Sequence, residues 1–152
     1  MKTLGFGVVL LAVGLGGCAM TYEAPDISNK PFSTVHLSSK QDILEQAEQA
    51  LLLEGFQIQS SDLKSGYIST SLKNWRLTPE QASCGKTMGI DYLKDNRTKT
   101  EVAFNVVVND QEVIIRSNIQ GEYKPGAATQ DITLTCVSRG VIEAEIAEKI
   151  LF

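Results

Sequence analysis

The chain of 152 residues has few of the residue types on which enzyme chemistry depends. It contains one histidine, His36, so a Ser-His-Asp or Cys-His arrangement would have to use that residue. No group of His, Cys, Asp and Glu has the spacing of a metal site, and the CxxC, GxGxxG, P-loop and GxSxG motifs do not occur. We therefore predict that the protein is not an enzyme, with no catalytic residue, no cofactor and no bound metal.

Positive charge is also scarce. The chain has 14 Lys and Arg against 18 Asp and Glu, which gives a net charge of −4 and a pI of about 5.0. Domains that bind nucleic acid, or that electrostatic attraction holds on anionic membranes, present a basic surface. We therefore predict no nucleic-acid partner, and any attachment to a membrane needs another cause.

Long apolar runs are absent except at the N-terminus. Lys2 precedes the apolar stretch 4–15 (LGFGVVLLAVGL), and no charged residue occurs from Thr3 through Tyr22. A positive start followed by a short apolar centre is the pattern of a secretory signal. A membrane-spanning helix is the alternative, but glycines interrupt the run and no basic cluster follows it.

The apolar stretch ends in residues 15–18 (LGGC), which resemble the lipobox of bacterial lipoproteins. The resemblance implies that residues 1–17 are removed as a signal peptide, and that Cys18 receives lipid and becomes the acylated N-terminus. With Ala19 after the cysteine, it also implies attachment to the outer membrane on its periplasmic side. The alternative is an ordinary cleaved signal. Such signals end in a cleavage site of the A-x-A type, which this stretch matches poorly.

The three cysteines are expected to have two different roles. If Cys18 carries lipid, Cys84 and Cys136 remain, and an even pair in an exported protein predicts a disulfide. The disulfide would close a loop of about 50 residues, which in the chain-entropy model contributes on the order of 4 kcal/mol. Two buried free thiols are the alternative.

Residues 18–33 contain two of the four prolines and show no periodicity. We predict that they form a lipidated tether and that residues 34–152 form a single domain. Within the domain, Ser39 and Asp42 make a capping-box pattern, with Ser38 and Gln41 as the other possibility. The spacing of the apolar residues that follow predicts a helix over 42–54, ended by a glycine.

Alternating apolar and polar residues predict strands over 34–37, 56–60, 67–73, 87–93, 100–108 and 112–123, with a short one over 131–135. Short turns between them indicate an antiparallel meander. A stripe of Ile142, Ile146 and Ile150 predicts a C-terminal helix that Ser138 caps. The predicted fold class is α+β, a two-layer sandwich in the order β-α-β-β-β-β-β-α, with an antiparallel sheet of about five strands covered by two helices.

One group of side chains is a candidate for binding. Trp75, Arg76 and Leu77 lie in the connection 74–86, where an aromatic side chain beside an arginine could contact a partner. Alternatively, Trp75 packs over the open edge of the sheet near the disulfide. We expect no functional role for the outward-facing His36 or for the solvated carboxylates of Glu143, Glu145 and Glu148.

The lipobox, the helix-to-strand passage 42–56 (DILEQAEQALLLEGF) and the element order together resemble small outer-membrane lipoproteins with a helix-grip domain. A domain of the C lipoprotein of the β-barrel assembly machinery is the nearest comparison. Residues 136–143 also resemble lipoproteins in which cysteine and serine precede a C-terminal helix. The resemblance implies a non-enzymatic envelope lipoprotein with a structural or partner-binding role. A carrier or sensor that holds a lipid-like ligand between sheet and helices is the alternative.

Overall fold

The computed structural model describes residues 22–28, 30–126 and 130–152. The predicted signal peptide and Cys18 lie outside the described residues. The elements are α1 (Lys40–Leu53), α2 (Val141–Leu151), the 3-10 turn η1 (Tyr92–Lys94), and the strands β1 (Tyr22–Glu23), β2 (Phe32–Val35), β3 (Ile58–Asp62), β4 (Tyr67–Thr70), β5 (Lys73–Asn74), β6 (Ala82–Ser83), β7 (Lys86–Thr87), β8 (Ile90–Asp91), β9 (Thr98–Val108), β10 (Glu112–Tyr123), β11 (Ile132–Thr135) and β12 (Val137–Ser138).

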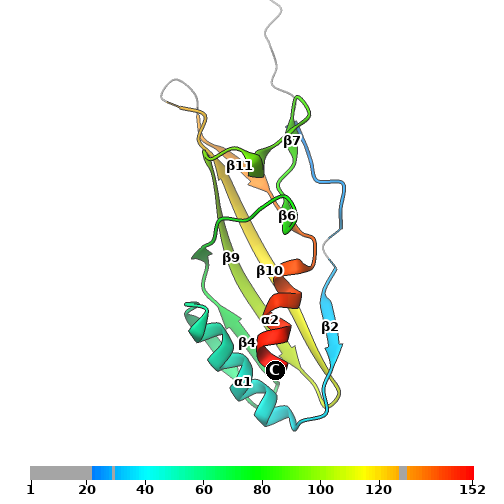
Figure 1. Ribbon diagram of the computed structural model, residues 1–152. Helices are drawn as coiled ribbons and strands as arrows, with labels where there is room; N and C mark the ends of the chain where they lie inside the picture. Colours follow the sequence, from blue (N-terminus) through cyan, green and yellow to red (C-terminus); the bar gives the residue numbers. More distant parts are fainter. Residues whose placement is uncertain (1–21, 29, 127–129) are drawn as a thin grey trace, which may run out of the picture.

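The centre of the fold is a seven-stranded antiparallel sheet built on its two longest strands, β9 and β10. These strands pair along the whole length of β9. The other edge of β10 carries β2 along one half and β11 along the other half. The other edge of β9 carries β4 and β5, and β3 continues the sheet beyond β4. Both helices lie on one face of this sheet (Figure 1).

The predicted fold class is wrong. Strands contain 41% of the described residues and helices 22%, so the chain is mostly β, and its main sheet has seven strands instead of about five. A three-stranded sheet of β1, β7 and β8 and a two-stranded sheet of β6 and β12 lie beside it. The error arises because β9 and β10 are long enough to hold two short strands end to end on one edge. Periodicity within a strand does not reveal that arrangement.

Helix α1 follows from its sequence. The Ser39 hydroxyl accepts a hydrogen bond from the backbone N–H of Asp42 at 3.2 Å, so this serine is the cap and the helix begins two residues before the predicted boundary. The helix ends where Gly55 adopts a φ of +79°. The N–H groups of Gly55 and Phe56 then reach the carbonyl oxygens of Leu52 and Leu51, which closes the last turn. The predicted apolar stripe is buried at Ile43, Leu44, Ala47, Ala50 and Leu51.

The strand boundaries agree best where the alternation is longest. β10 matches the predicted range 112–123, and β9 begins two residues before the predicted 100–108. β2 and β3 are each shifted by two residues from the predicted 34–37 and 56–60. The predicted strand 67–73 is divided into β4 and β5, because each pairs with a different part of β9.

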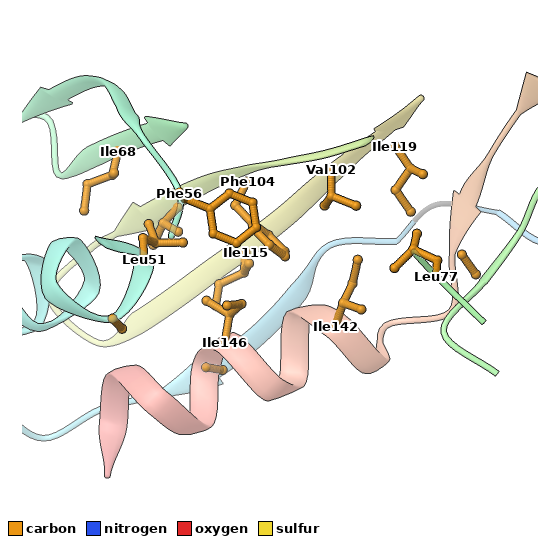
Figure 2. Packing of buried hydrophobic residues seen from close by; sticks show 14 of the residues in the cluster. Leu51, Phe56, Ile68, Leu77, Val102, Phe104, Ile115, Ile119, Ile142 and Ile146 are labelled. Carbon is orange, nitrogen blue, oxygen red and sulfur yellow. The ribbon is translucent and has the colours of Figure 1, made fainter. Parts of the chain in front are cut away.

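A single core fills the space between the main sheet and the helices (Figure 2). The rings of Phe56 and Phe104 are 5.1 Å apart in an edge-to-face contact, and Trp75 packs against both. From α2, the predicted stripe of Ile142, Ile146 and Ile150 is at most 1% exposed. Side chains therefore occupy the space between sheet and helices, which is where the alternative function would place a lipid-like ligand.

Candidate functional site

One end of the molecule contains both β1 and the predicted pair of Cys84 and Cys136, and we call it the disulfide end. The Sγ atoms of Cys84 and Cys136 are 2.00 Å apart, which is the distance of a disulfide bond, and 52 residues separate the two cysteines. Cys84 is fully buried. A Cβ on Gly121 would lie 2.5 Å from the Cys136 sulfur, so strand β10 needs a glycine where it passes the disulfide.

Strand β1 docks beside this disulfide. Tyr22 pairs with Thr87 of β7, and its ring lies 6.0 Å from the ring of Tyr92. The Tyr22 hydroxyl is within 3.5 Å of the carbonyl oxygen of Cys84, to which it donates. Gly85 lets β1 approach, because its φ is +84° and a Cβ there would lie 2.4 Å from a β1 carbonyl oxygen. The predicted tether 18–33 therefore contains β1, which is attached to the domain, and the start of β2.

The hairpin of β7 and β8 corrects the predicted strand 87–93. Its two-residue turn consists of Met88, with a φ of +50°, and Gly89, with a φ of +77°. Positive φ at both positions is the geometry of a tight hairpin turn that matches the twist of its strands. The alternation of Met88, Ile90 and Tyr92 therefore marks a hairpin and a helical turn instead of one strand. Met88 is 79% exposed and Ile90 is 62% exposed.

Glu143 is a buried carboxyl that the sequence places wrongly on a solvated face. It is 1% exposed and accepts hydrogen bonds from the hydroxyls of Ser117 and Ser138, the latter at 2.6 Å. Ser138 also accepts the N–H of Gly140 at 3.0 Å, so it braces the start of α2 although Gly140 is the cap residue. No histidine contacts these groups among the described residues. The arrangement is suited to fixing α2 against β10.

The group Trp75, Arg76 and Leu77 does not form one surface. Leu77 is 2% exposed and belongs to the core. Trp75 is half-buried against Phe56, whereas Arg76 is exposed. Trp75 therefore packs on the core, where its ring contacts Phe56 and Phe104.

An ion pair stabilises the turn that leads into β9. The Arg97 guanidinium donates to Asp95, with an Nη2–Oδ2 distance of 2.6 Å, and these hydrogen bonds lower the pKa of the Asp95 carboxyl to about 2. The guanidinium also lies 5.0 Å from the centre of the Tyr123 ring. Burial raises the pKa of Tyr123. Sequence reasoning missed this cluster, for which the only local signal is an Asp two residues before an Arg.

His36 is buried, which corrects the expectation that it faces outward. Its Nδ1 and Nε2 atoms are each 2.9 Å from a carbonyl oxygen, of Ser38 and of Asn109 respectively. It therefore connects the turn before α1 to the turn between β9 and β10. In the part of the chain that the structure describes, no three or more His, Cys, Asp and Glu residues are grouped so that they could hold a metal ion. None of the described helices has the length and apolar character needed to cross a membrane.

No protein-family model matches this chain, and no curated protein matches its sequence. The polar groups described above, His36, Glu143 and the pair of Asp95 and Arg97, are all used to join elements of the fold. The disulfide end contains β1, the first described strand, and the exposed apolar side chains of Met88 and Ile90.

Proposed function

We propose that the protein is a lipoprotein anchored through Cys18 to the periplasmic side of the outer membrane, and that its domain has a structural or partner-binding role in the cell envelope. The observation that carries the proposal is the position of the lipobox cysteine, four residues before Tyr22. Tyr22 begins a strand that is docked on the domain. A lipid on Cys18 would thus hold the domain directly at the bilayer.

The disulfide supports an exported location. Disulfides persist in oxidising compartments such as the periplasm and are rare in the cytosol. The lipid on Cys18 and the pair of Cys84 and Cys136 together account for all three cysteines of the chain.

Two features favour a structural or partner-binding role over the alternatives. The polar side chains that could take part in chemistry, His36 and Glu143, are buried and bonded to the protein's own groups. The core residues between sheet and helices are in contact with one another, so no observation favours the alternative of a lipid-like ligand carried there. An envelope protein is the partner that we propose.

Palmitate labelling tests the anchor. In a bacterium with two membranes, the wild-type chain should incorporate labelled palmitate and sediment with the outer membrane. Cys18→Ser should remain unlabelled and be released. The matched control is Cys84→Ser with Cys136→Ser, which removes the other two cysteines and should still be labelled. Labelling of the Cys18→Ser chain would refute the proposal.

A further inference from the structure

We propose that the tip of the β7–β8 hairpin, consisting of Met88, Gly89 and Ile90, inserts into the surface of the bilayer that holds the lipid anchor. The inference rests on the proposed function, because it needs a lipid on Cys18. It adds a second contact with the membrane, which would give the domain a fixed orientation there.

The direction of β1 brings the chain into the domain from the side of this tip. β1 is antiparallel to β7, with Tyr22 opposite Thr87 and Glu23 opposite Lys86. The chain therefore enters the small sheet from the side on which β7 continues into the turn at Met88. Only three residues separate Cys18 from Tyr22, and four extended residue steps span at most about 14 Å. The hairpin tip is thus within reach of the lipid headgroups.

The side chains at the tip fit a lipid surface. Met88 and Ile90 are 79% and 62% exposed, although both are apolar. Met88 is the first residue of the tight turn, and Ile90 follows the turn as the first residue of β8. The exposed Lys86 lies two residues before Met88. Apolar side chains beside a lysine suit the interface between bilayer and water, where the apolar parts enter and the ammonium group stays hydrated.

The orientation that results can be followed in Figure 1. β7 lies at one end of the molecule, and the connection between β2 and α1 lies at the opposite end. Docking of the hairpin would point this connection away from the membrane. Leu37, in that connection, is fully exposed and serves as a matched control position.

Fluorescence quenching by brominated lipids tests the contact. The lipidated mature chain, which begins at Cys18, is reconstituted into phosphatidylethanolamine and phosphatidylglycerol vesicles, with and without lipids brominated near the headgroup. Ile90→Trp places a probe at the tip and Leu37→Trp places one at the far end. Both variants keep Trp75, so the wild-type signal is subtracted from each. Thermal unfolding midpoints equal to that of the wild type establish that the variants are folded.

We expect brominated lipid to quench the Ile90→Trp signal and to leave the Leu37→Trp signal unchanged. Equal quenching of the two, while both proteins float with the vesicles, would overturn the hairpin contact and leave the anchor intact. Flotation of the vesicles reports the anchor separately. If the wild-type chain carries no lipid and does not float with the vesicles, both proposals are overturned.

Discussion

Removal of the disulfide should cause a large and calculable loss of stability. Cys84 and Cys136 are 52 residues apart, and a cross-link of that span restricts the unfolded chain by about 4 kcal/mol in the chain-entropy model. We therefore expect Cys84→Ala with Cys136→Ala to lower the free energy of unfolding by about 4 kcal/mol. For a domain of this size the corresponding decrease in Tm is roughly 15 °C.

Urea unfolding followed by circular dichroism measures this loss, with Cys18→Ser as the background so that no lipid is present. Reduction of the parent protein by a thiol reagent supplies the control, since it opens the cross-link and leaves both sulfur atoms in place. The same reagent should not change the double alanine variant. A loss below about 1 kcal/mol in both arms would refute the reasoning, because loop closure would then not dominate.

Three further outcomes are expected. Gly121→Ala should hinder the Cys84–Cys136 bond, because the added Cβ would meet the Cys136 sulfur at 2.5 Å, and a free-thiol assay on the purified protein measures this. Glu143→Ala should cost about 2–4 kcal/mol in urea unfolding, since it leaves buried serine hydroxyls without their acceptor. The pKa of Asp95 is about 2 in the fold and 3.8 ordinarily, so the pair with Arg97 stabilises the fold above about pH 4, and this contribution is lost as the pH falls toward 2.

Each of these outcomes has a matched comparison. Gly89→Ala adds a methyl group where nothing lies within 4 Å, so it strains the backbone at a φ of +77° without meeting the disulfide, and it should leave the free-thiol content unchanged. Glu143→Gln keeps an acceptor for the serines and should cost less than the alanine variant. Arg97→Gln should raise the pKa of Asp95 in a carboxyl NMR titration. An unchanged pKa in that variant would contradict the assignment of the shift to the guanidinium.

Elements whose signals are local could be predicted from the sequence. The cap at Ser39, the apolar stripe and Gly55 together define α1, because all three act within one helix. β10 is predicted with its full range because alternation over twelve residues leaves little ambiguity. The cysteine pair also follows from a count, because assigning Cys18 to the predicted lipobox leaves two cysteines.

Features that depend on distant residues could not be predicted. The burial of Glu143 requires Ser117 on another element, 26 residues away. The two-residue strand at Tyr22 exists because β7 accepts it, and nothing in its own sequence indicates a strand. The fold class was wrong for the same reason, since the number of strands in the main sheet depends on which short segments share the edges of β9 and β10.

The pairing along β10 has a consequence for the order in which the chain can fold. One edge of this strand is completed by β2, from the start of the domain, and by β11, near its end. Cys136 follows β11 directly, so its bond to Cys84 also waits for the last part of the chain. Because synthesis starts at the N-terminus, the sheet cannot be completed until almost the whole chain has been made. The topology thus delays completion of the main sheet until the end of synthesis is near.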